Sequence, residues 1–280
     1  MRERLEDVFK TVSGRTVSLV GQPPLGGSQA AEWDFESPAS WCWHCGIVAD
    51  DLSLDAEGQM YQVFEKYEDL LAQSFMTVAA HCVRTWIYVR DIDDNYAGVV
   101  SGRKRYFEEI GLTPDTHYIA STGIAGTHLN PKVLVMMDAL AIPDLEPGRL
   151  QYLRASDYLS RTIDYGVTFE RGTSFRYGNR RYTFISGTAS IDKYGAILYK
   201  GDAGRQTNRA LDNIEALLAE DGATTADIAS ALVYLRNPAD VQTVREAIDR
   251  RLPCLDYLLL HAPVCRPDWL VEIECIAVRP

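Results

Sequence analysis

An internal repeat is the feature of this sequence that most constrains its fold. Each copy runs from a segment rich in Val, Ile, Leu and Tyr through an amphipathic stretch to a second apolar segment. Tyr88 aligns with Tyr234, and Arg90 aligns with Arg236. The aligned apolar segments are 83–94 with 229–240, and 133–142 with 269–278. A repeat of this kind indicates one supersecondary unit that is used twice.

Each unit is predicted to be strand, helix and strand, with one more helix ahead of it. Apolar residues recur at helical spacing within 59–75 and within 205–220, whereas the strand-like segments are short. In the second copy, alternating runs on both sides of Gly178 and Asn179 predict a β-hairpin. The expected fold class is α+β: two tandem domains, each a mixed sheet with two helices on one face.

The two copies are expected to form separate domains. The chain has 280 residues, which suits two domains of typical size. Pro and Gly residues are concentrated in segment 143–156, between the two copies, as is typical of a loop. We therefore place the boundary near residue 150, which gives domains 1–150 and 151–280.

Charge and hydropathy narrow the classes of partner. The chain has 28 Lys and Arg against 39 Asp and Glu, a formal net charge of −11, which argues against nucleic-acid binding through a basic face. No segment approaches the ~20 apolar residues of a transmembrane helix, and the first ten residues are charged where a signal peptide would be apolar. Six scattered cysteines indicate reduced, packed thiols. We expect a cytoplasmic protein without a membrane partner.

The last apolar segment places two carboxylates on one face of a predicted strand. Side chains alternate along a strand, so Glu272 and Glu274 point to the same side. Met136 aligns with Glu272 and Asp138 with Glu274, so only the second copy keeps both carboxylates. One interpretation is the solvated face of an edge strand. The other is a catalytic pair, in which the like-charged neighbour and partial burial raise the pKa of a general acid/base.

Two arginines and a cysteine near this strand are candidate binding residues. Arg266 lies in the turn that leads into the strand, and Arg171 precedes the hairpin. Each arginine either clamps a substrate carboxylate or lies on the surface. Cys265 is better explained as a packed thiol than as a nucleophile, because the only histidine near it in the sequence is His261.

Two further motifs give weaker signals. Cys42 and Cys45 form a lone C-x-x-C without a second Cys or His pair at metal spacing, so no metal site is predicted. Segment 121–126 contains two glycines but does not match a phosphate-binding loop. It indicates a close approach of the backbone to another backbone or to a ligand.

Several strings in the second copy resemble the Rid family, also called the YjgF family, of imine and enamine deaminases. They include FISGTASID, VYLRNPAD and VEIECIAV. The tandem arrangement, together with FERG and VCRPDWLVEIE, is also similar to the chorismatases, which carry two such domains and remove the enolpyruvyl group from chorismate. The resemblance covers 165–280 strongly and 60–142 more faintly.

The resemblance implies an architecture. Each copy would form a chorismate-mutase-like sheet with two helices on one face, and three sheets would close into a barrel with ligand sites in the clefts between neighbours. Two copies supply two thirds of such a barrel, so a homotrimer is expected. Because the first copy is degenerate, one ligand per chain is expected.

The resemblance also implies roles for residues. Glu272 would position or activate the attacking water, aided by Glu274. Gly187, in the FISGTASID string, joins the candidate substrate-binding residues. In the deaminases an arginine holds the substrate carboxylate at the position of Leu255 here, so Arg266 or Arg171 would take over anion binding.

The primary hypothesis is an enzyme without a cofactor that acts on an imine, enamine or enol ether by general acid/base chemistry. Its substrate would be a small molecule that bears a carboxylate. The alternatives are chorismatase-like removal of enolpyruvate from chorismate, and a non-catalytic oligomer that binds a ligand. Assays with chorismate and 2-iminobutyrate separate the two enzymatic alternatives.

Overall fold

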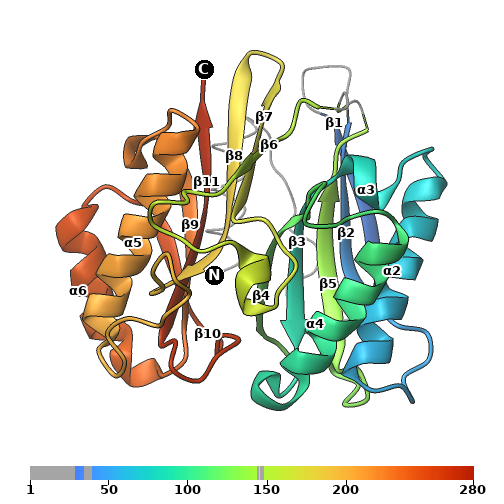
Figure 1. The fold of residues 1–280 in the computed structure, drawn as a ribbon, viewed down its shortest axis with the longest axis horizontal. Coiled ribbons are helices and arrows are strands. Elements are labelled where there is room, and N and C mark those ends of the chain that lie inside the picture. The colour runs from blue at the N-terminus through green and yellow to red at the C-terminus, as the bar shows by residue number, and fades with distance from the viewer. Residues whose placement is uncertain (1–28, 35–39, 144, 146–147) are drawn as a thin grey trace.

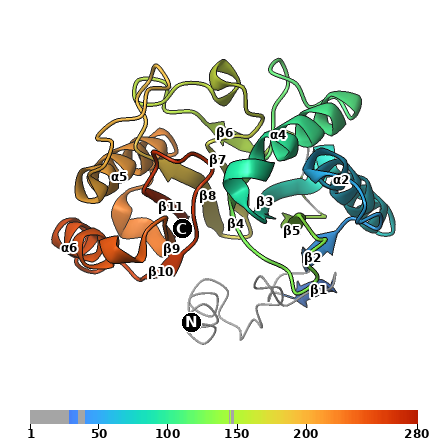
Figure 2. The same ribbon diagram turned by 90° about the horizontal axis from the view of Figure 1, so that it is seen from below.

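The computed structural model describes residues 29–34, 40–143, 145 and 148–280, with side chains from residue 41 onward. The charged first ten residues therefore lie outside the described part. Figure 1 shows two sheets side by side in the middle of the molecule, with helices on their outer faces. Seen from below, the two sheets follow one continuous arc with the helices outside it (Figure 2).

The first sheet has five strands in the order β1-β2-β5-β3-β4. Neighbours are antiparallel except β3 and β4, which are parallel. Helices α2 and α4 pack on one face. The elements are β1 (Gln29–Asp34), β2 (Ser40–Val48), α2 (Ala56–Ala72), α3 (Val78–His81), β3 (Cys82–Val89), α4 (Ile92–Glu109), β4 (Ala120–Ala125) and β5 (Val135–Ala141).

The second sheet has six strands in the order β10-β9-β11-β8-β7-β6. Here β9 and β10 are the parallel pair, and α5 and α6 cover the outer face. The elements are β6 (Gln151–Leu153), η1 (Thr162–Tyr165), β7 (Gly172–Tyr177), β8 (Arg180–Ala189), α5 (Ala203–Glu220), η2 (Thr225–Asp227), β9 (Ile228–Leu235), η3 (Pro238–Asp240), α6 (Val241–Arg251), β10 (Tyr257–His261) and β11 (Val271–Arg279).

The strand register confirms the repeat. Tyr88 on β3 pairs with Met136 on β5, and Tyr234 on β9 pairs with Glu272 on β11. The α+β fold with two helices on one face of each sheet is therefore as predicted. Two helices start earlier than their apolar spacing indicated, because aspartates cap them. Asp55 accepts from the Gly58 amide, and Asp202 accepts from the Arg205 amide.

Of the two interpretations of the paired carboxylates, the solvated face of an edge strand is wrong. Strand β11 lies between β9 and β8 in the middle of its sheet. Glu272 and Glu274 are only 4% and 5% exposed. Their face is not solvated, because it is turned away from α5 and α6 and toward the first copy. The burial agrees with what the catalytic interpretation assumes, and the catalytic role stays a prediction.

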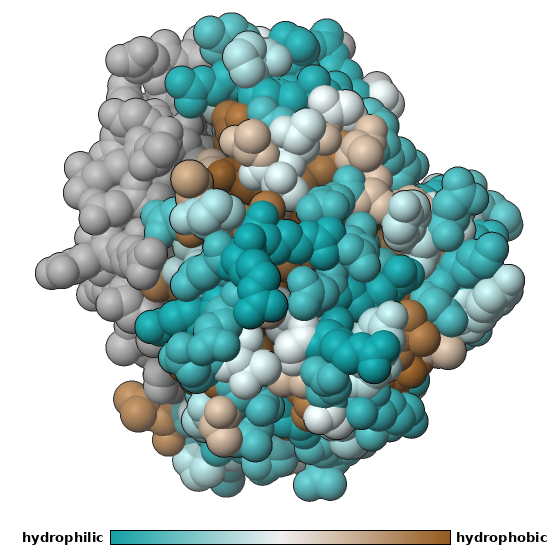
Figure 3. Space-filling model, turned by 90° about the vertical axis from the view of Figure 1, so that its left-hand side faces the viewer, coloured by the Kyte–Doolittle hydropathy of each residue, from teal (hydrophilic) through white to brown (hydrophobic). Residues whose placement is uncertain are grey.

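Three buried clusters hold the molecule together. One lies between the first sheet and its helices, and another between the second sheet and its helices. The third joins the inner faces of the two sheets through aromatic rings, where Trp41 meets Phe175 and Tyr182. The outer surface around α5 and α6 is mainly hydrophilic (Figure 3). This distribution follows from amphipathic helices that bury one stripe each.

Strand β4 joins the two copies. The Ala125 amide donates to the Pro263 carbonyl at 2.8 Å, and the Glu170 amide donates to the Ile119 carbonyl at 3.0 Å. The Ser121 amide donates to Ser186 Oγ on β8. These bonds place the edge of the first sheet against the segments that flank β7, β8 and β11.

In the described part of the chain, no helix combines the length and apolar character needed to cross a membrane.

Candidate active site

A cleft lies between the two copies, where β4 meets β8 and the loops ahead of β7 and β11. The first copy contributes residues of α4 and β4, and the second contributes the remainder. Five of the six residues predicted for the site line it: Glu272, Gly187, Arg171, Arg266 and Cys265. The sixth, Glu274, lies behind Glu272 on the same face of β11. Residues that are far apart in the sequence thus meet in one place.

The carboxyl of Glu272 is buried and has a raised pKa. Burial and, second, the charge of Glu274 raise the pKa of this carboxyl to about 8. Arg84 and Arg171 oppose this shift. A carboxyl with this pKa carries its proton at pH 7 and can donate it to a bound molecule.

Gly187 makes room for this carboxyl. A Cβ atom at position 187 would lie 2.1 Å from Glu272 Oε1 and 2.9 Å from the Thr122 methyl group. The Gly187 amide donates to Thr122 Oγ1 at 2.9 Å. No side chain larger than hydrogen fits without moving the acid.

Glu274 does not line the cleft, because donors from the first copy hold its carboxylate. Arg84 Nη2 lies 2.7 Å from Glu274 Oε2, and Trp86 Nε1 donates to Oε1 at 2.7 Å. Thr122 Oγ1 donates to Oε2 as well. This position favours an electrostatic role behind Glu272 over direct proton transfer.

Arg171 and Arg266 flank one aromatic ring. Each guanidinium carbon lies 5.3 Å from the centroid of Tyr165. Arg171 is 5% exposed, so it is no surface arginine, whereas Arg266 is half-buried. The Arg266 Nη2 donates weakly to the Tyr165 carbonyl at 3.4 Å. Both arginines line the same cleft as Glu272.

Arg103 on α4 is a third cation of the cleft, which the sequence analysis missed. Its side chain is almost fully buried, and burial lowers its pKa. Nε donates to Thr168 Oγ1 at 3.2 Å, and Nη2 has no hydrogen-bond partner among the described residues. A signal existed: Arg103 shares the apolar stripe of its helix with Val99 and Tyr106. A charge on such a stripe indicates a buried role.

Cys265 lines the cleft as a thiol. Burial raises its pKa to about 12, and the neighbouring charge of Glu272 acts in the same direction. A thiol with this pKa has almost no thiolate at neutral pH, so it is a poor nucleophile. The packed interpretation fits this environment.

The remaining motifs are structural in this fold. Cys42 and Cys45 lie buried on β2, and burial raises the pKa of Cys45. Among the described residues, no three His, Cys, Asp or Glu side chains are grouped to hold a metal ion. The glycines of 121–126 lie close to side chains rather than to another backbone, since a Cβ on Gly126 would lie 2.7 Å from Tyr88 Cβ and one on Gly123 would lie 3.0 Å from the Tyr96 ring.

Comparisons with known proteins agree with this architecture. The family described as Endoribonuclease L-PSP matches residues 176–279. A chorismatase of Streptomyces hygroscopicus is 30% identical over 208 residues, which covers 68% of this chain and 60% of that protein. A RutC family protein of Pyrococcus abyssi is 31% identical over 108 residues, which covers 38% of this chain and 84% of that protein.

A solved structure extends the match to both copies. The crystal structure of a chorismatase covers 91% of this chain and 80% of its own, with a TM-score of 0.72 and 25% sequence identity. The chain spans about 60% of the length of the chorismatase relative from Streptomyces hygroscopicus. With the repeat and the cleft between its copies, these matches show that the chain belongs to the Rid (YjgF-like) family, as a tandem member similar to the chorismatases.

Proposed function

We propose that this chain is a cofactor-independent enzyme that cleaves a small enol ether bearing carboxylates, with Glu272 as the general acid. Chorismate is the first candidate substrate. The observation that carries the proposal is one cleft lined by the buried Glu272 carboxyl, whose pKa burial raises to about 8, and by Arg103, Arg171 and Arg266. This combination offers a proton donor and an anion-binding surface to the same molecule.

The reaction starts with proton transfer to carbon. The Glu272 O–H bond breaks, and the π electrons of the enol ether form a new C–H bond at its terminal carbon. The adjacent carbon becomes an oxocarbenium centre, which the new Glu272 carboxylate stabilises. Water adds to this centre and returns a proton to Glu272. The hemiketal then collapses: its hydroxyl proton passes to the ether oxygen, the C–O bond to that oxygen breaks, and an alcohol and a 2-oxo acid leave.

The arginines bind and orient the substrate in this scheme. Arg171 is held by the Ser160 carbonyl at 3.1 Å, and its guanidinium stacks near the rings of Tyr165 and Phe169. Arg103 keeps one amino group unpartnered within the described residues. Charge-assisted bonds from these groups to carboxylates are about twice as strong as neutral ones. Two carboxylates on one substrate match this arrangement.

Imine deamination fits the cleft less well. Register pairs Tyr88 with Ile124 and Tyr234 with Leu260, so Ile119 in the first copy is equivalent to Leu255 in the second. Neither copy therefore has a cation at the position where the deaminases carry their arginine. The chorismatase relatives, which match across both copies, support the enol ether.

Turnover of two substrates by the purified chain tests the proposal. We expect pyruvate release from chorismate and no turnover of 2-iminobutyrate. Glu272→Gln should lower kcat by ~10²–10⁴-fold, as loss of a general acid does. Glu65→Gln, an exposed carboxylate on α2, is the matched control and should leave the rate unchanged.

Three outcomes contradict parts of the proposal. An unchanged rate in Glu272→Gln would remove this residue from the mechanism. Turnover of 2-iminobutyrate alone would assign the cleft to imine chemistry. Binding of chorismate in calorimetry without product would make the chain a ligand-binding protein.

A further inference from the structure

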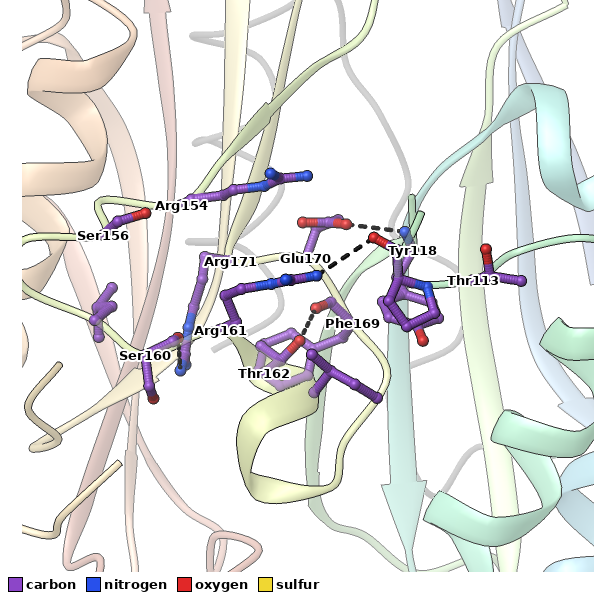
Figure 4. Close-up of a pocket in the computed structure, with 13 residues that line it drawn as sticks. Thr113, Tyr118, Arg154, Ser156, Ser160, Arg161, Thr162, Phe169, Glu170 and Arg171 are labelled. Atoms are coloured by element: carbon purple, nitrogen blue, oxygen red, sulfur yellow. Dashed lines mark hydrogen bonds between the residues drawn. The ribbon is translucent and has the colours of Figure 1, made fainter. Parts of the chain in front are cut away.

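A second cavity lies beside the catalytic cleft, on the other side of the segment that carries Phe169 and Arg171. Both of these residues line both spaces. Figure 4 shows the second cavity with its arginines, Ser160 and Glu170. The loop between β6 and β7 forms most of it, and Tyr118 and the loop ahead of it close one side. The proposed reaction does not use this space.

Two buried polar atoms at this cavity have no partner in the described part of the chain. They are Arg171 Nε and Ser160 Oγ. Arg171 is 5% exposed and Ser160 is 7% exposed. Leaving such groups unpaired in the interior is destabilising, so a ligand with acceptor oxygens would gain by filling the cavity.

The rim of the cavity is cationic. Arg154 and Arg161 are exposed, and in Figure 4 the Glu170 carboxyl lies between their side chains. Arg161 Nη2 donates only to the Pro114 carbonyl at 3.3 Å. Glu170 accepts from the Tyr118 amide at 2.9 Å. Two guanidinium groups thus flank one acid, while Arg171 points toward Ser160.

We propose that this cavity is a binding site for a small organic monocarboxylate, separate from the catalytic cleft. The ligand's oxygens would bind Arg171 Nε and Ser160 Oγ, and its carbon chain would contact Leu159 and Ile163. These apolar walls favour an organic anion over an inorganic one.

Glu170 favours a single negative charge. Burial raises the pKa of its carboxyl, while Arg154 and His117 oppose the shift. An ionised Glu170 repels a doubly charged phosphate more than a monocarboxylate, and a protonated Glu170 donates a hydrogen bond to the latter. Short 2-oxo acids such as pyruvate belong to the class that fits.

The shared Arg171 couples the two spaces. An occupant that bonds to Arg171 Nε restrains the same guanidinium that faces the substrate. We therefore expect the occupant to raise KM for the substrate more than it lowers kcat. This consequence, unlike the site itself, rests on the proposed function.

Calorimetric titration of the full chain with pyruvate tests the site without any turnover. The titration uses Arg266→Gln, which weakens anion binding in the cleft. We expect pyruvate binding to persist in this variant and to weaken at least tenfold when Arg154→Gln and Arg161→Gln are added. Arg245→Gln, an exposed arginine on α6, is the matched control and should leave binding unchanged.

The remaining outcomes decide the proposal. Failure of phosphate to displace pyruvate supports a carboxylate site, and tighter binding of phosphate overturns that assignment. No pyruvate binding to the wild-type chain, or binding that the two rim substitutions leave unchanged, overturns the site. Thermal unfolding of each variant verifies that it is folded. Because no substrate is present, failure here leaves the proposed enzymatic reaction intact.

Discussion

Arg84 on β3 and Glu274 on β11 form a buried ion pair across the two copies, with 2.7 Å between Nη2 and Oε2. The Arg84 guanidinium also lies 4.8 Å from the ring centroid of Trp86, which donates to the same carboxylate. Removing charges from water is costly unless they are paired and hydrogen-bonded. The pair therefore stabilises the contact between the two copies, and it also sets the charge next to Glu272.

Arg84→Met should lower the free energy of unfolding by about 3–5 kcal/mol, because it leaves Glu274 buried without its cation. Urea denaturation followed by circular dichroism measures this change. The control is Lys104→Met, which breaks an exposed pair with Glu108 and should cost under about 1 kcal/mol. Equal losses of unfolding free energy in the two variants would show that the buried pair stabilises the fold no more than the exposed pair does.

Gly187→Ala should abolish most activity while the fold survives. The added methyl group meets Glu272 Oε1 at 2.1 Å, so the acid must move. A displacement of about 1 Å at the reacting group costs ~10²-fold in rate, and kcat on chorismate measures it. Gly204→Ala in α5, where the new Cβ meets a Thr243 methyl at 3.1 Å and Asp202 Oδ1 at 3.6 Å, should keep its rate. An active Gly187→Ala enzyme would contradict the placement of the acid.

Thiol labelling should distinguish Cys265 from Cys254. Cys254 is exposed, whereas burial raises the pKa of Cys265 to about 12. Because the thiolate is the reactive form, iodoacetamide at pH 8 should modify Cys254 first, as mass spectrometry of peptides reports. Cys254→Ser should remove the rapid labelling. Rapid modification of Cys265 would contradict its assignment as a packed thiol.

The oligomeric mass tests the expected trimer. A chain of this architecture supplies two sheets of a three-sheet barrel, and three chains together supply the six sheets of two barrels. We therefore expect light scattering to give three times the chain mass of 31.3 kDa. The catalytic cleft is complete within one chain, so each chain should bind one substrate molecule. A monomeric mass would contradict the packing argument.

The sequence predicted those parts of the fold that depend on local patterns. Helical spacing located α2 and α5, and alternation along β11 placed Glu272 and Glu274 on one face. These patterns show which side of a helix or strand is apolar, and the order of a few neighbouring residues is enough to decide this. The tandem arrangement followed because the same pattern occurs twice.

The sequence did not predict contacts between the copies. Alternation indicates which side chains share a face but not which strands lie on either side, so an edge position for β11 stayed open as one interpretation. Arg84 and Thr122 are bound to Glu274 only because β3 and β4 face β11 in space. Arg103 was missed for a related reason, since its partner Thr168 lies in the other copy.

The pH dependence of stability provides the last prediction. The carboxyl of Glu272 has a pKa of about 8 in the folded chain against an ordinary value of 4.5, and burial is the main cause. Between these values the folded state binds the proton more tightly than the unfolded state does, so the free energy of unfolding falls as pH rises. Glu272→Gln cannot ionise and should lack this contribution.

Urea denaturation at pH 5, 6.5 and 8 measures the difference between wild type and Glu272→Gln. Other buried acids, such as Asp138 with a pKa of about 7, contribute equally to both proteins and cancel. The variant should therefore gain stability relative to wild type with each step in pH, and kcat/KM of the wild type should fall above pH 8 as the acid loses its proton. Parallel stability profiles would show that Glu272 ionises normally, and the general-acid role would then lose its physical basis.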